Sequence, residues 1–157
     1  MHEDIAGAGW KLHHLGIPVS DLDQAMADYR GLGIASFGEP FLIDSSRAAE
    51  YLVYGKRPDP VVTTRGVMGR MGAVGVELLQ PLTGHTVHRE LLEQSGSGVG
   101  HVAYTVDDLE GEASRLEAVG FPVILSITPA GRTGRSAVYI DTRGSFSNLI
   151  VELIQAA

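Results

Sequence analysis

Residues 14–33 read HLGIPVSDLDQAMADYRGLG, and residues 101–120 read HVAYTVDDLEGEASRLEAVG. The two stretches align without a gap from position 14 to position 101, an offset of 87. Identical residues recur at matched positions: His14 and His101, Val19 and Val106, Asp21 and Asp108, Leu22 and Leu109, and Gly33 and Gly120. An internal repeat of this kind predicts that the chain contains two copies of one structural unit.

A second repeated motif lies downstream of each stretch, where residues 74–80, VGVELLQ, match residues 149–155, LIVELIQ. The polar residues shared by the two motifs are Glu77 with Glu152 and Gln80 with Gln155. Here the offset from position 77 to position 152 is 75, so the second copy is 12 residues shorter between its repeated His and its repeated Glu. The repeat therefore covers most of the chain.

Each copy is expected to contain a strand, a helix and then further strands. Short, partly alternating apolar runs predict the opening strands at residues 12–19 and 101–106. The helices are expected to start at capping boxes, Ser20 with Asp23 and Asp107 with Glu110, and to end at the repeated glycines. The later strands are expected at 37–43, 50–54, 61–71 and 74–80 in the first copy, and at 122–128, 136–141 and 148–154 in the second. One candidate in the first copy is then irregular, and both copies have the order β-α-β-β-β, which makes the fold class α+β.

The two copies are expected to form one domain over residues 1–157. The first module spans residues 10–94 and the second spans residues 99–157. Residues 86–93 are expected to form a short helix between them, and Ser95-Gly96-Ser97-Gly98 has the composition of a flexible joint.

Composition narrows the class of protein. The chain has 157 residues, no cysteine and a formal net charge of −7, which excludes disulfides, thiolate catalysis and cysteine-based zinc sites. An acidic chain is a poor nucleic-acid binder, and no apolar run has the length of about 20 residues that a membrane helix needs. The N-terminal sequence also lacks the features of a secretion signal. We therefore expect a cytoplasmic protein with no nucleic-acid or membrane partner. We also expect a homodimer that covers its open sheet edges.

Of the His and Glu residues, only His14 with Glu77 and His101 with Glu152 recur at matched places in both copies. If the modules are related by a pseudo-twofold axis, these four side chains converge, and two imidazoles with two carboxylates suit a divalent first-row metal. Strand alternation selects His14, on a face of small residues, over His13 on the opposite face. A carboxylate inside an apolar strand costs several kcal/mol without a partner, which a cation would offset. In the alternative, both Glu face solvent, but their paired recurrence with His argues against it.

Other candidates carry weaker signals. His2, His85 and His88 have no matched partner in the repeat and are expected to be surface or packing residues. The stretch Gly131-Arg132-Thr133-Gly134-Arg135 is either a site where Arg132 and Arg135 bind an anionic substrate group or an ordinary hairpin turn.

The sequence resembles the vicinal oxygen chelate superfamily, which includes glyoxalases, methylmalonyl-CoA epimerases, extradiol dioxygenases and bleomycin-resistance proteins. The motifs that carry the resemblance are His14-Leu15-Gly16-Ile17-Pro18-Val19, Val76-Glu77-Leu78-Leu79-Gln80-Pro81-Leu82, Gly100-His101-Val102-Ala103 and Val151-Glu152-Leu153. The resemblance implies two tandem βαβββ modules whose mixed sheet forms a cup around a metal. It also implies that His14, Glu77, His101 and Glu152 are the ligands of a divalent ion, which their chemistry leaves open among Co, Ni, Zn, Mn, Mg and Fe.

Within the superfamily, the second half looks most like methylmalonyl-CoA epimerases, although those often have Gln at the position of Glu77. The resemblance implies an isomerase that binds a small-molecule substrate and removes a proton next to its carbonyl through a metal-stabilised enediolate. Glu152 or Glu77 would be the base if one leaves the metal, and Glu50 is a candidate that is not a ligand. The alternatives are a glyoxalase-type lyase acting on a hemithioacetal, a non-catalytic antibiotic-binding protein and, less favoured, an Fe(II) dioxygenase using His14, His101 and Glu152.

Overall fold

The computed structural model describes residues 9–145 and 148–157, so His2 lies outside the described residues. In the first copy, β1 (Lys11–Pro18) precedes α1 (Leu22–Gly31), β2 (Ser36–Phe37), β3 (Phe41–Asp44), a 3-10 turn (Ser45–Arg47), β4 (Glu50–Val53), β5 (Thr63–Met71) and β6 (Val74–Thr83). Helix α2 (Val87–Ser95) joins the copies. The second copy contains β7 (His101–Val106), α3 (Leu109–Ala118), β8 (Val123–Thr128), β9 (Ala137–Ile140) and β10 (Ile150–Gln155).

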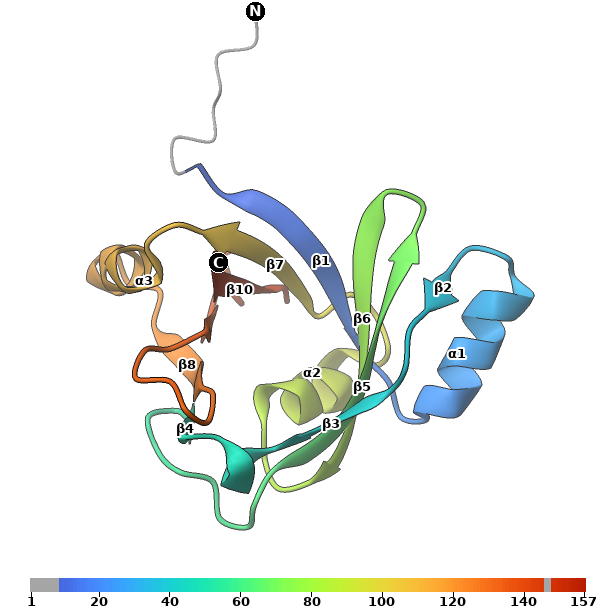
Figure 1. The fold of residues 1–157 in the computed structure, drawn as a ribbon, viewed down its shortest axis with the longest axis horizontal. Coiled ribbons are helices and arrows are strands. Elements are labelled where there is room, and N and C mark those ends of the chain that lie inside the picture. Colours follow the sequence, from blue (N-terminus) through green and yellow to red (C-terminus); the bar gives the residue numbers. More distant parts are fainter. Residues whose placement is uncertain (1–8, 146–147) are drawn as a thin grey trace, which may run out of the picture.

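The described strands form one curled sheet in the order β2-β5-β6-β1-β7-β10-β9-β8-β4, and β3 also pairs with β5. The copies meet at the centre, where β1 runs antiparallel to β7. Each copy also pairs its first strand with its last in parallel, β1 with β6 and β7 with β10. Figure 1 shows α1 and α3 at opposite outer flanks of the sheet and α2 inside the curl. The predicted α+β cup of two βαβββ units is confirmed.

The irregular segment of the first copy is β4, which leaves its own half of the sheet. It pairs antiparallel with β8 of the second copy, with Tyr51 opposite Ile127 and Val53 opposite Leu125. The strand expected at residues 37–43 is split into β2 and β3, both on β5. The chain therefore crosses from one end of the sheet to the other between β3 and β4, and this connection helps to close the cup.

The helix starts differ from the predicted capping boxes. Asp21 and Asp108 are the N-caps, and their side chains accept hydrogen bonds from the backbone N–H groups of Gln24 and Gly111. The repeated Gln residues add a second cap in each copy: Gln80 accepts from the N–H of Leu22 at 3.0 Å, and Gln155 accepts from the N–H of Leu109 at 3.0 Å. The backbone N–H groups at the start of a helix have no partner within the helix. The recurrence of these Asp and Gln residues in both copies is explained by the hydrogen bonds they accept from such groups.

Three apolar clusters stabilise the cup. Leu22 and Met26 of α1 pack on the outer face of the first half, and Leu109 and Ala113 of α3 pack on the outer face of the second. Helix α2 contributes the third cluster, in which buried residues of α2, β4, β8, β9 and β10 meet inside the curl; they include Val87, Leu91, Tyr51, Val53, Leu125, Tyr139 and Ile150. No helix among the described residues is both long enough and apolar enough to cross a bilayer.

Candidate metal centre

His14, Glu77, His101 and Glu152 converge at the centre of the cup, where one ligand atom from each lies within 4.8 Å of the others. Each comes from a different strand, and these four strands, β6, β1, β7 and β10, are consecutive in the sheet. His14 Nε2 lies 3.2 Å from Glu152 Oε2 and 3.6 Å from Glu77 Oε1. His101 Nε2 lies 3.1 Å from Glu152 Oε2 and 3.8 Å from Glu77 Oε1, and the two histidine Nε2 atoms are 3.1 Å apart. The sequence prediction that these four side chains come together agrees with this geometry.

A glycine on the neighbouring strand makes room for one of these side chains. Gly16 lies opposite His101 where β1 pairs with β7, and a Cβ at Gly16 would overlap three atoms of the His101 ring. The ring can therefore occupy this place only because position 16 has no side chain. This explains physically why position 16, on the inner face of β1, is a glycine.

The electrostatics of the group are dominated by burial. Burial by itself would lower the pKa of His14, but hydrogen bonds and charge from Glu152 and Glu77 raise it to about 9. Burial would raise the pKa of Glu152, but contacts with His101 and His14 lower it to about 2. The carboxylate charge therefore persists inside the protein, and it needs positive charge beside it.

The arrangement fits a divalent ion. Two ligand atoms that each lie about 2.1 Å from one metal are about 3.0 Å apart when their bonds are at right angles and about 4.2 Å apart when the bonds are opposite. The four separations between histidine nitrogens and carboxylate oxygens, 3.1 to 3.8 Å, fall in that range. Glu152 Oε2 is buried and faces the Nε2 atoms of His14 and His101 at 3.2 and 3.1 Å. A buried carboxylate oxygen facing two imidazole nitrogens is the donor set that Zn, Co, Ni, Mn or Fe would accept.

Two aromatic residues that the sequence analysis did not place at the site enclose His101. The rings of His88 on α2 and Tyr139 on β9 lie 5.7 Å and 5.2 Å from the His101 ring, measured between centroids. Tyr139 stands opposite Glu152 in the β9–β10 pairing, so both project from the same face. Burial lowers the pKa of His88 to about 3, which keeps this ring neutral. The helical spacing of Val87, His88 and Leu91 is the signal that would have assigned His88 to the buried side of α2.

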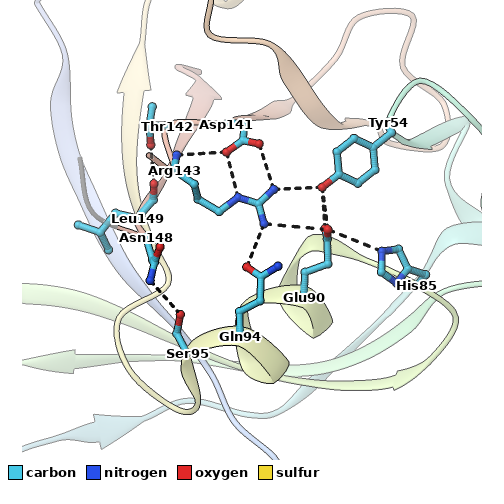
Figure 2. Close-up of polar contacts among 10 residues, drawn as sticks. All are labelled: Tyr54, His85, Glu90, Gln94, Ser95, Asp141, Thr142, Arg143, Asn148 and Leu149. Atoms are coloured by element: carbon cyan, nitrogen blue, oxygen red, sulfur yellow. Dashed lines mark hydrogen bonds and ion pairs between the residues drawn. The ribbon is translucent and has the colours of Figure 1, made fainter. Parts of the chain in front are cut away.

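A cluster of polar side chains, here called the clasp, holds α2 against the second half of the cup (Figure 2). It consists of Tyr54, Glu90, Gln94, Asp141 and Arg143. The Arg143 guanidinium binds Asp141 Oδ1 at 2.9 Å and Oδ2 at 3.0 Å, and donates to the Tyr54 hydroxyl at 3.1 Å. That hydroxyl donates to Glu90 of α2 at 2.8 Å. Because the clasp fixes α2, it also fixes His88 against His101.

The remaining predicted residues lie elsewhere. Glu50 is on β4 next to Tyr51, whose side chain points into the cup, and strand alternation therefore puts Glu50 on the outer face. The structure does not bring it to the four ligand-type residues. Arg132 and Arg135 line a surface hollow with the C-terminal residues and with none of those four. The Arg135 guanidinium is bound by the Glu110 carboxylate of α3 at 2.6 Å and 2.8 Å.

A different hollow lies beside the four residues on the first half of the sheet. Its lining includes His13, Met68, Arg70 and Gly75. Met68 stands opposite Glu77 in the β5–β6 pairing, so both side chains project from the inner face of the sheet, and alternation puts Arg70 on that face as well. Its lining contains none of the four ligand-type residues, but Gly75 pairs with His14 between β1 and β6, so the hollow lies on the strands that carry the group.

Comparison with known proteins gives consistent matches. The family model described as Glyoxalase/Bleomycin resistance protein/Dioxygenase superfamily matches residues 13–139. An ethylmalonyl-CoA/methylmalonyl-CoA epimerase of Cereibacter sphaeroides is 29% identical over 147 residues, which are 92% of this chain and 97% of that protein.

Solved structures agree in fold. Methylmalonyl-CoA epimerase from Mycobacterium tuberculosis superposes with a TM-score of 0.65 at 20% identity, over 94% of this chain and 88% of its own. A hypothetical protein from Bacillus halodurans gives a TM-score of 0.66 at 18% identity, over 95% and 96% of the two chains. A Streptomyces coelicolor methylmalonyl-CoA epimerase in complex with 2-nitronate-propionyl-CoA gives 0.61 at 19%, over 94% and 97%.

Proposed function

We propose, from the premise that this chain belongs to the Glyoxalase/Bleomycin resistance protein/Dioxygenase superfamily, that it is a divalent-metal-dependent epimerase of coenzyme A thioesters. The observation that carries the proposal is the convergence of four donor atoms, two imidazole and two carboxylate, within 4.8 Å. A metal bound by His14, Glu77, His101 and Glu152 would act as a Lewis acid that makes a proton next to a carbonyl more acidic. The Cereibacter sphaeroides relative, whose name places it in this reaction class, supports the choice of epimerase over the other activities of the superfamily.

The hollow beside the centre favours a substrate that carries negative charge. The Arg70 guanidinium in this hollow donates to the backbone carbonyl of Ala73 at 2.8 Å and forms no ion pair with a described residue. It is exposed and stands on the same face as Glu77. A carboxylate or phosphate would pair with this guanidinium, while the apolar side chain of Met68 borders the acyl group. A 2-carboxyacyl thioester of coenzyme A has both groups.

Glu77 is the carboxylate best placed to accept the substrate proton. Its Oε1 lies 3.6 and 3.8 Å from the histidine nitrogens, whereas Glu152 Oε2 lies 3.2 and 3.1 Å from them. The Glu77 side chain is also more exposed, at 14% against 8% for Glu152. With a metal held by the four residues, Glu77 would be the more loosely placed carboxylate and would accept the substrate proton, whereas Glu152 would remain a ligand.

The test combines metal content with hydrogen exchange. Metal per chain is measured on protein purified without chelator, and deuterium uptake from heavy water at the α-carbon is measured for methylmalonyl-CoA and ethylmalonyl-CoA. The parent is expected to hold about one divalent ion and to catalyse exchange. Glu77→Gln is expected to retain metal, because an amide oxygen can still bind it, and to lose exchange by about 100-fold or more. His101→Ala is expected to lose both.

Other outcomes would contradict the proposal. Exchange that persists in Glu77→Gln would remove Glu77 from the role of base. Turnover of a glutathione hemithioacetal without thioester exchange would identify a lyase instead. If the parent binds no divalent ion after reconstitution, a metal-free binding protein is the better account. If Glu77→Ala retains metal and turnover depends on oxygen, a dioxygenase is favoured.

A further inference from the structure

The ring of His13 contacts the ring of its neighbour His14, on the side away from the metal centre. The two Nδ1 atoms are 2.7 Å apart, and the rings are nearly perpendicular, with an interplanar angle of 76° and centroids 5.0 Å apart. This separation is a hydrogen-bond distance, so one nitrogen donates and the other accepts.

The contact depends on a local irregularity of β1. The pairing of β1 with β7 shifts register between Leu12 and His14, which leaves His13 as the extra residue of a β-bulge. In a regular strand His13 would point to the face opposite His14, as the sequence pattern predicted. A bulge re-aims a side chain, and here it brings the His13 ring to the His14 ring.

The chemistry of the centre decides which nitrogen donates. His14 Nε2 faces Glu152 and His101, so Nε2 is the atom available to a metal. A neutral imidazole that binds a metal through Nε2 carries its proton on Nδ1, and this N–H then donates to His13 Nδ1. His13 in turn carries its own proton on Nε2, and its side chain is exposed.

We propose that His13 is a positioning residue for the metal ligand His14: it accepts a hydrogen bond from His14 Nδ1–H, fixes the tautomer and ring orientation, and so strengthens metal binding through Nε2. Outer partners of this kind make the imidazole a more basic ligand, and their loss weakens metal binding by about 10- to 100-fold. The inference rests on the metal centre of the proposed function, but not on the substrate or the reaction.

The repeat provides an internal comparison. At the offset of 87, Gly100 occupies the position of His13, so the second copy has no equivalent side chain. Correspondingly, His101 Nδ1 is buried without a hydrogen-bond partner among the described residues. The two histidine ligands are therefore inequivalent, and the supported ligand is the one beside the hollow that His13 helps to line.

The test compares His13→Ala and His13→Asn with the parent, and uses His85→Ala as the matched control because His85 is an exposed histidine outside the centre. Affinity for Zn²⁺ is measured by competition with a chelating dye, and the His14 ring is observed by ¹⁵N NMR in the zinc-loaded protein. His13→Ala is expected to bind Zn²⁺ about 10- to 100-fold more weakly and to show faster solvent exchange of the His14 Nδ1 proton. His13→Asn is expected to recover part of the affinity, since its Oδ1 accepts from nearly the same place as Nδ1, and His85→Ala is expected to match the parent.

Each other outcome has a definite meaning. Parent-like zinc affinity and an unchanged His14 Nδ1 proton in His13→Ala would overturn the inference while leaving the metal centre intact. A parent that binds zinc with the expected His13 effect, but exchanges no thioester proton, would refute the proposed epimerase activity alone. Absence of zinc binding by the parent would refute both.

Discussion

Metal binding at the four-residue centre is expected to release a proton from His14. In the metal-free protein, burial would lower the pKa of His14, but Glu152 and Glu77 raise it to about 9. His14 is therefore protonated at neutral pH, and the metal must displace that proton to reach Nε2. The pKa of Glu152 is lowered to about 2, so this carboxylate has no proton to lose.

The size of the effect follows from the distance between the assay pH and this pKa. At pH 7, two units below a pKa of about 9, roughly 1% of molecules carry a neutral His14, so the apparent affinity is about 100-fold below its limit at high pH. The sign is fixed: raising the pH strengthens binding by about tenfold per unit between pH 7 and pH 8, and the dependence fades above pH 9. About one proton leaves per metal bound at pH 7.

Isothermal titration of Co²⁺ in buffers with different ionisation enthalpies measures this number directly. At each pH the observed enthalpy, plotted against the buffer's ionisation enthalpy, gives the protons released. His85→Ala serves as the control that keeps the release, because this exposed histidine stands apart from the centre. Tight binding with fewer than about 0.3 protons released at pH 7 would refute the reasoning, since it would mean that His14 is already neutral in the metal-free protein.

Two further predictions concern the scaffold around the centre. Gly16→Ala is expected to lower the free energy of unfolding by about 1–3 kcal/mol and to weaken metal binding at least tenfold, because the new Cβ overlaps the His101 ring. The matched control in urea unfolding and zinc titration is Gly31→Ala, where a Cβ meets no atom within 4 Å. Equal behaviour of the two variants would contradict the steric argument. Arg143→Ala is expected to lower the free energy of unfolding by about 2 kcal/mol, because it leaves the partly buried carboxylate of Asp141 without its charged partner. A midpoint of urea unfolding equal to that of the parent would show that the clasp contributes nothing to the stability of the fold.

Some features of the site were beyond sequence reasoning because they depend on the register of strand pairing. Strand alternation placed His13 opposite His14, and the bulge that reverses this has no marker in the sequence. The helix starts are another feature that the sequence does not fix, because the predicted N-caps lie one residue too early. Ser20 and Asp21 both have the chemistry of an N-cap, and only the backbone conformation distinguishes them. The position of Glu50 in the sequence makes it a candidate base, but its outward direction follows only from the pairing of β4 with β8.

The repeated sequence by itself determined the two βαβββ units, the α+β class and the four residues that converge, because duplication places matched side chains symmetrically about one centre. The expected homodimer and cytoplasmic location stay predictions. Only the tertiary structure decided that β4 crosses to the other half of the sheet and that α2 lies inside the curl. It also decided that His88 of α2 and Tyr139 of β9 contact His101, and that His13 contacts His14. Sequence periodicity records which face of an element is apolar, whereas the partner that covers that face is chosen by packing between segments far apart in the chain.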